Sequence, residues 1–142
     1  MPEQDLFIAE PRGKYQALPP IVVDCSVLAA LVFEETHAEN AREVLSGKTL
    51  CAPWLIDHEM VSVALKKAAS SLAQAQQGLE YLSQLRLTRC PTDRQAQWRL
   101  AHTYELSAYD AAYLQLAIEL EVPLVTYDRS LGRVAEQVLA NF

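Results

Sequence analysis

The sequence predicts an α/β protein with a mostly parallel central sheet. Short apolar segments, such as 21–23 and 124–126, alternate along the chain with longer segments of helical character. Two of these strand segments lead directly to a carboxylate, at Asp24 and near Asp128. Parallel strands end at the same edge of a sheet, so both acids should lie at the edge where α/β proteins bind their ligands.

The composition is that of one globular domain. The chain has 142 residues, of which 51% are hydrophobic and 21% charged, so it can bury a sizeable core. The apolar segment 21–33 is interrupted by Asp24 and is too short to span a bilayer, and no secretory signal is recognisable near Met1. We therefore expect a cytoplasmic protein that does not associate with membranes.

Charge and cysteine content limit the function further. A formal net charge of −6 argues against a generic nucleic-acid-binding domain, although two bound divalent cations would reduce it to −2. The cysteines are widely spaced and form no C-x-x-C pair, so we expect small buried hydrophobic residues and no zinc or redox site. They are Cys25, Cys51 and Cys90.

The first half begins with an arm at 1–20, which is rich in proline. The sequence does not decide whether 6–9 within this arm forms an edge strand. Ser26 is predicted either to cap the N-terminus of a helix or to contact the side chain of Asp24 and hold it in place. Gly47 suits a helix C-terminus, and Pro53 suits the first turn of a helix. The predicted strands are 21–23 and 49–52, and the predicted helices are 27–33, 38–45 and 54–69.

The second half continues the alternation without a linker, so 21–142 should form one domain. Thr92 is the expected N-cap of one helix, and Ser107 with Asp110 forms the S-x-x-D pattern of another. The helix that follows Ser107 is apolar nearly all round, which predicts a buried position. The predicted helices are 71–85, 92–104, 108–120 and 131–139, and the predicted strands are 87–90 and 124–126.

Four acids stand out by position: Asp24, Glu59, Asp110 and Asp128. Two follow strands and two lie in first turns of helices, so they should converge at one sheet edge. Carboxylates about 4 Å apart repel by about 4 kcal/mol at an effective dielectric constant of 20, so such a cluster takes up protons or binds a cation. Oxygen ligands favour Mg²⁺ or Mn²⁺ over zinc, which suits metal-assisted phosphodiester hydrolysis.

Simpler explanations exist for three of the acids. Asp110 could only cap its helix, Asp128 could only initiate a turn, and Glu59 could only face solvent. Asp24 is harder to explain in this way, because an acid directly after IVV is buried at a free-energy cost.

Two other chemistries are disfavoured. The zinc-protease pattern H-E-x-x-H fails because Ser62 stands in place of the second histidine. A phosphoacceptor receiver domain needs a lysine after a late strand, and no lysine follows Lys67.

The motifs around the four acids resemble those of the PIN-domain family, in particular the VapC-type toxin ribonucleases of toxin-antitoxin pairs. An apolar strand followed by D-x-[ST], a middle acid on a helix, S-x-x-D-A and T-x-D occur in the family's order. The matching residues are Asp24, Ser26, Glu59, Ser107, Asp110, Thr126 and Asp128.

The resemblance implies a three-layer α/β/α sandwich, Mg²⁺ or Mn²⁺ at the four acids, endonucleolytic cleavage of RNA, homodimers and inhibition by a cognate antitoxin protein. Ser26, Ser107 and Thr126 would then support the acids without binding the metal. Many relatives have Asn where this chain has Ser62, and the family's final edge strand is missing or short, so the arm at 1–20 could supply that edge. A non-catalytic PIN-like binding module and a housekeeping PIN nuclease remain the alternatives.

The same resemblance suggests how an antitoxin would bind. An arginine could block the acids, and an amphipathic segment could lie along the helices at 27–33 and 54–65. Phe33, Trp54 and Leu55 are candidate anchors, with core packing as the alternative for each.

Overall fold

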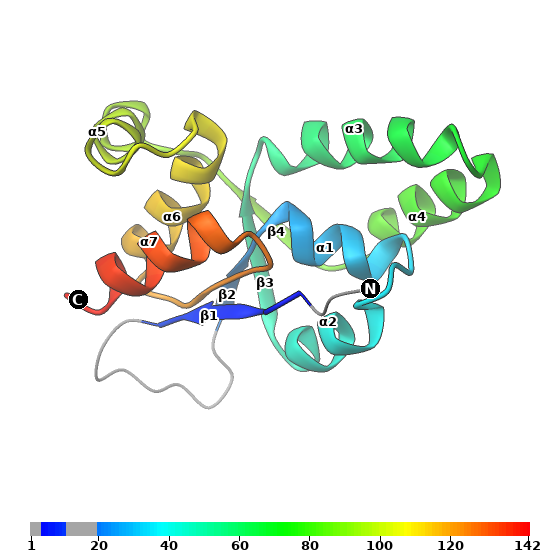
Figure 1. The fold of residues 1–142 in the computed structure, drawn as a ribbon, viewed down its shortest axis with the longest axis horizontal. Helices are drawn as coiled ribbons and strands as arrows, with labels where there is room; N and C mark the ends of the chain where they lie inside the picture. Colours follow the sequence, from blue (N-terminus) through cyan, green and yellow to red (C-terminus); the bar gives the residue numbers. More distant parts are fainter. Residues whose placement is uncertain (1–3, 11–19) are drawn as a thin grey trace.

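The computed structural model describes residues 4–10 and 20–142, and its centre is a five-stranded sheet with the strand order β1-β5-β2-β3-β4 (Figure 1). The pairs β5–β2, β2–β3 and β3–β4 are parallel, whereas β1 pairs with β5 in the antiparallel direction. The strands are β1 (Phe7–Ala9), β2 (Pro20–Val23), β3 (Thr49–Pro53), β4 (Leu87–Cys90) and β5 (Leu124–Thr126). The predicted α/β class with a mostly parallel sheet is confirmed.

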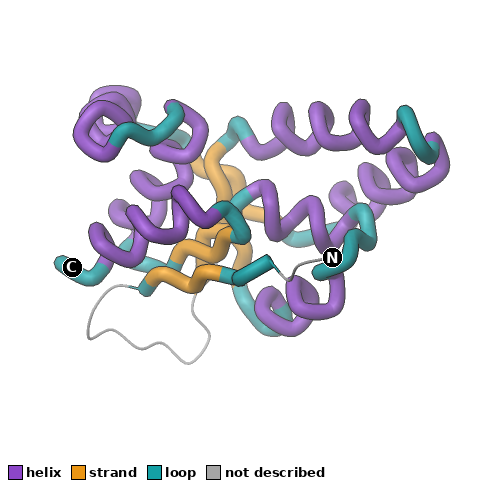
Figure 2. Tube along the Cα trace, viewed as in Figure 1, coloured by secondary structure: helices purple, strands orange, loops and turns teal. Residues whose placement is uncertain are grey.

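Helices cover both faces of the sheet, as the tube view also shows (Figure 2). Helices α1 to α4 pack together on one side, and α5 to α7 lie on the other, so the architecture is a three-layer α/β/α sandwich. The helices are α1 (Cys25–Val32), α2 (Ala38–Leu45), α3 (Ile56–Ala68), α4 (Leu72–Gln84), α5 (Arg94–Tyr104), α6 (Ala108–Leu120) and α7 (Arg129–Leu139).

The core lies between the sheet and the helices α1 and α6. Strands β2 and β5 are apolar and buried, as expected for parallel strands covered on both faces. Helix α6 buries residues around most of its circumference, which confirms its predicted position. Of the helices in the described part of the chain, none is long and apolar enough to span a membrane.

Residues Phe7–Ala9 form strand β1, so the edge strand considered at 6–9 is present. It runs antiparallel along β5, with Phe7 opposite Thr126 and Ala9 opposite Leu124. Four residues of the predicted arm are therefore part of the sheet: the three of β1 cover its edge at β5, and Pro20 begins β2. Residues 1–3 and 11–19 of that arm lie outside the described part of the chain.

Several helix starts differ from the prediction. Asp24, two residues before Ser26, caps α1, and Asp93, one residue after Thr92, caps α5, because a neighbouring carboxylate reaches the free N–H groups equally well. Pro53 ends strand β3, so α3 begins three residues after it. Helix α7 begins two residues earlier than predicted, because Asp128 caps it.

The expected environment of several side chains was also wrong. Phe33 is 1% exposed and packs against Gly78 of α4, so it cannot anchor an antitoxin. Trp54 is 59% exposed, so the core packing given as its alternative is wrong, and its role as an anchor stays a prediction. Of the cysteines, Cys51 is buried but Cys25 and Cys90 are only partly so.

Candidate active site

Asp24 lies at the carboxyl end of β2 and is the most buried of the four acids, with 5% of its surface exposed. Its Oδ2 atom accepts hydrogen bonds from the Ser26 and Thr126 hydroxyls, both at 2.8 Å, and from the Ser26 N–H at 3.4 Å. These donors compensate for the removal of the carboxylate from water. The predicted supporting contacts of Ser26 and Thr126 are therefore present.

The two hydroxyls also tie strand β5 to strand β2. Ser26 Oγ accepts a hydrogen bond from the Tyr127 N–H at 2.9 Å, and Thr126 Oγ1 accepts one from the Asp128 N–H, also at 2.9 Å. The neighbouring strands are held in register by the pair Val23 and Val125. Asp24 and Asp128 therefore start from adjacent strand ends, as the sequence predicted.

Glu59 projects from the first turn of α3 and is half-buried. Its Oε1 atom accepts a hydrogen bond of 2.5 Å from the hydroxyl of Tyr113, a fully buried residue of α6. Glu59 is therefore held in place and is not simply a solvated residue. Sequence analysis missed Tyr113, although its position three residues after Asp110 places it on the same face of the helix.

Asp110 and Asp128 both take part in helix N-termini. The Ser107 hydroxyl accepts a hydrogen bond from the Asp110 N–H at 3.0 Å, which confirms the predicted cap of α6. Asp128 itself caps α7, since its Oδ1 accepts a hydrogen bond from the Leu131 N–H at 3.0 Å. Asp128 therefore caps a helix where the simpler explanation expected a turn, and its charge also raises the pKa of Asp110.

Burial and neighbouring charges perturb the pKa values of three of the four acids. Burial raises the pKa of Asp24, and burial together with the charges of Asp24 and Asp110 raises the pKa of Glu59. Burial, followed by the charges of Asp128 and Asp24, raises the pKa of Asp110 to about 6. Acids from four different elements therefore share one electrostatic neighbourhood at the carboxyl edge of the sheet, where perturbed groups are typical of functional sites.

The donor set suits a hard cation such as Mg²⁺. All four candidate ligands are carboxylates, and Mg²⁺ is commonly held by one or two carboxylates while it keeps several waters. Among the described residues, no three His, Cys, Asp or Glu side chains form a ready-made metal cage. The fit to Mg²⁺ thus rests on the chemistry of the carboxylates, and binding of all four acids to one ion stays a prediction.

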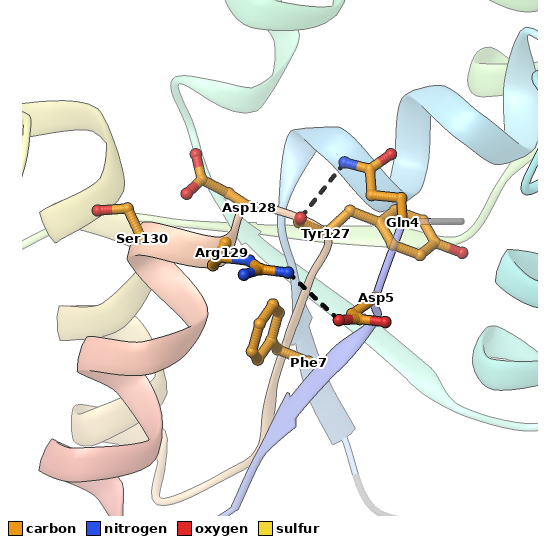
Figure 3. Close-up of a pocket in the computed structure, with 7 residues that line it drawn as sticks. All are labelled: Gln4, Asp5, Phe7, Tyr127, Asp128, Arg129 and Ser130. Atoms are coloured by element: carbon orange, nitrogen blue, oxygen red, sulfur yellow. Dashed lines mark hydrogen bonds and ion pairs between the residues drawn. The ribbon is translucent and has the colours of Figure 1, made fainter. Parts of the chain in front are cut away.

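Two cavities flank the acids. One of about 580 Å³ lies beside Asp128, between the start of α7 and the segment before β1 (Figure 3). The other, of about 530 Å³, lies beside Glu59, and Ser62 lines it together with Cys25 and Leu55. Ser62 thus stands next to the middle acid, as its place in the family pattern implied.

Comparison with known proteins identifies a family. The PIN domain model matches residues 21–137. Ribonuclease VapC9 of Mycobacterium tuberculosis is 32% identical over 116 residues, which cover 79% of this chain and 88% of the relative. Ribonuclease VapC1 of the same species is 33% identical over 121 residues, which cover 77% of this chain and 89% of the relative.

A solved structure shows the same architecture. The crystal structure of PAE2754 from Pyrobaculum aerophilum superposes with a TM-score of 0.63 at 25% sequence identity. The match covers 86% of this chain and 95% of the other. The solved structure therefore has the same overall fold as this chain.

Proposed function

Because the chain belongs to the PIN-domain family and is of the VapC type, we propose that it is a ribonuclease and the toxin of a type II toxin-antitoxin pair. The two relatives named above carry the name ribonuclease and match most of this chain. The observation that carries the proposal is the shared electrostatic neighbourhood of four acids from four elements.

In the proposed reaction, Asp24, Glu59, Asp110 and Asp128 hold Mg²⁺ or Mn²⁺ beside the RNA phosphodiester. The bound ion would lower the pKa of the attacking water and stabilise the leaving oxygen. The protein's own part is positioning: Ser26 and Thr126 fix the carboxylate of Asp24 by hydrogen bonds.

The same positioning applies to the middle acid and to its neighbour. Tyr113 donates its hydroxyl proton to a hydrogen bond with Glu59, which keeps that carboxylate turned toward α6. Ser107 fixes the start of α6 and thereby the direction in which Asp110 projects. Local hydrogen bonds thus limit the motion of these acids, as preorganised sites require.

Asp24→Asn tests the proposal. The change keeps the shape and the capping oxygen but removes a ligand charge, so RNA cleavage should fall by a factor of about 100 or more, comparable to the loss of a key electrostatic group. Asp93→Asn is the matched control, because Asp93 caps α5 in the same manner and is exposed. Cleavage that persists in EDTA would contradict the metal dependence, and equal cleavage by the two variants would contradict the role of Asp24. Absence of any RNA cleavage by the wild-type protein would favour the non-catalytic module.

An antitoxin is the proposed protein partner, and a homodimer is the proposed assembly. Trp54 is 59% exposed just before α3, and Leu55 lines the cavity beside Glu59, so both are accessible to a docked segment. Trp54→Ala should therefore weaken antitoxin binding more than RNA cleavage. A housekeeping PIN nuclease, the second candidate, would show cleavage but no such inhibitor, and the mass in solution tests the dimer.

A further inference from the structure

The segment before β1 lies at the same sheet edge as the four acids. Because β1 runs antiparallel to β5, the residues that precede β1 lie where β5 ends. Gln4 Nε2 donates a hydrogen bond of 3.3 Å to the Tyr127 carbonyl oxygen, and Asp5 forms an ion pair with Arg129. Gln4 and Asp5 therefore border Asp128.

The cavity of about 580 Å³ lies between this segment and the first turn of α7 (Figure 3). Asp128 lines this cavity and also acts on the pKa of Asp110, so the cavity adjoins the acid cluster. Phe7 forms part of its wall and packs against Gly132, where any Cβ would overlap the Phe7 ring. The cavity thus depends on both the arm and helix α7.

The size and the lining of this cavity fit a nucleotide. Its volume lies within the range of about 300–1,000 Å³ that is usual for small-molecule sites. Arg129 offers a planar guanidinium for a phosphate, and Phe7 offers an aromatic ring of the kind on which bases stack. The Gln4 amide can both donate to and accept from a base edge, as base-specific contacts require.

Arg129 is available for a phosphate because its ion pair is weak. The Arg129–Asp5 distance is 3.4 Å, and the two side chains are 64% and 71% exposed. Exposed pairs of this kind contribute about 0–1 kcal/mol. Arg89 contrasts with it, since two hydrogen bonds of 2.6 and 2.8 Å hold that guanidinium on Asp57.

We propose that Gln4, Asp5, Phe7 and Arg129 form a subsite that binds one nucleotide of the RNA next to the bond that is cut. Arg129 contacts the phosphate of this nucleotide, and Asp5 competes with the phosphate for Arg129. The inference rests on the proposed function for its choice of ligand, but it concerns binding and not the hydrolytic step.

Nucleoside 5′-monophosphates are suitable probes because they contain no bond that a ribonuclease cuts. The full-length protein, labelled with ¹⁵N, is titrated with each of the four ribonucleoside 5′-monophosphates and, separately, with inorganic phosphate. Saturable shifts should concentrate at the backbone amides of 4–7 and 127–130. At least one nucleotide should bind more tightly than inorganic phosphate.

Three variants separate the subsite from general electrostatics. Arg129→Gln should weaken nucleotide binding by a factor of about 5–10, the scale of one charge-assisted contact. Arg133→Gln removes the same charge from an exposed position one turn further along α7 and should leave binding unchanged. Asp5→Asn should tighten binding by a factor of about 2–3, because it removes the competitor of a weak ion pair.

Each outcome bears on one proposal at a time. Absence of saturable shifts, equal loss in the Arg129→Gln and Arg133→Gln variants, or phosphate binding as tight as that of every nucleotide would overturn the subsite while leaving RNA cleavage untouched. Conversely, nucleotide binding at these amides without any RNA cleavage would support the subsite and refute the proposed function. Shifts that appear only beside Glu59 would place the nucleotide in the other cavity and reject this one.

Discussion

At the scale of single residues, the acids are distinguished by what holds them. Asp24 is nearly inaccessible and receives three hydrogen bonds on one oxygen, which is more than a helix cap requires. Glu59 receives one short hydrogen bond from Tyr113. The supporting groups thus control both the direction and the protonation of the acids, and the consequence for Glu59 can be measured.

Tyr113→Phe should move the acid limb of the pH–activity profile to higher pH. The Tyr113 hydrogen bond lowers the pKa of Glu59 and opposes the effect of burial, so its removal leaves that pKa higher. A loss of about 1 kcal/mol in the free energy of unfolding is expected as well, the usual net value of one hydrogen bond. The measurement is the cleavage rate of an RNA substrate between pH 5 and 9.

Tyr104→Phe is the control, because it removes a hydroxyl from a half-buried tyrosine of α5. An unshifted acid limb in Tyr113→Phe, or an equal shift in both variants, would show that the hydrogen bond does not set the protonation of Glu59.

The sequence could predict the four acids because strand ends and helix caps are local patterns. It could not predict Tyr113 as a partner of Glu59, nor Gln4 as a neighbour of Tyr127, because these contacts join distant parts of the chain. The misplaced cap at Ser26 has a different cause: Asp and Ser are equally good N-caps, so propensity cannot choose between adjacent candidates.

At the scale of elements, close packing of α4 on α1 explains why Phe33 is in the core. Gly78 of α4 lies against the Phe33 ring and leaves no room for a Cβ atom. The sequence shows Gly78 as an ordinary helix-weakening residue, and only the tertiary contact gives the reason for it. Helix lengths followed from apolar periodicity, whereas the ends depended on which side chain reached the free N–H groups.

Gly78→Ala should destabilise the protein by about 1–3 kcal/mol, the usual effect of overpacking, in spite of the higher helix propensity of alanine. Gln77→Ala, on the exposed side of the same helix, should change the free energy of unfolding by less than about 0.5 kcal/mol. Urea denaturation of both variants provides the comparison. A Gly78→Ala protein as stable as the wild type would mean that the Phe33 ring can shift at little cost.

At the scale of the whole molecule, the carboxylates at the edge of the sheet lower the stability of the metal-free protein at neutral pH, and the same carboxylates are the proposed cation ligands. The pKa values of Asp24, Glu59 and Asp110 are all raised. At pH values just above the ordinary pKa of a carboxylic acid, the folded chain therefore binds more protons than the unfolded chain. Asp57 acts in the opposite sense, since the hydrogen bonds from Arg89 lower its pKa, but its contribution is lost only at more acidic pH. The three acids with raised pKa values therefore determine how stability changes with pH near pH 5.

The metal-free protein should become less stable as the pH rises from 3.8, the ordinary pKa of Asp110, through about 6, its value in the folded chain. Added Mg²⁺ should raise the Tm at pH 7 and have little effect at pH 4, where protons occupy the carboxylates. Calorimetry with EDTA or Mg²⁺ measures both effects. A metal-free Tm that rises over this interval would contradict the assigned pKa directions.

The pairing of β1 with β5 has a consequence for the timing of synthesis. Phe7 is synthesised more than 100 residues before its partner Thr126, and Asp128 follows Thr126. At about 5–20 residues per second, the N-terminal strand waits roughly 6–24 s for its place in the sheet. Until β5 and Asp128 have been made, the nascent chain therefore has neither a complete acid edge nor the cavity beside it, so the site is assembled only late in synthesis.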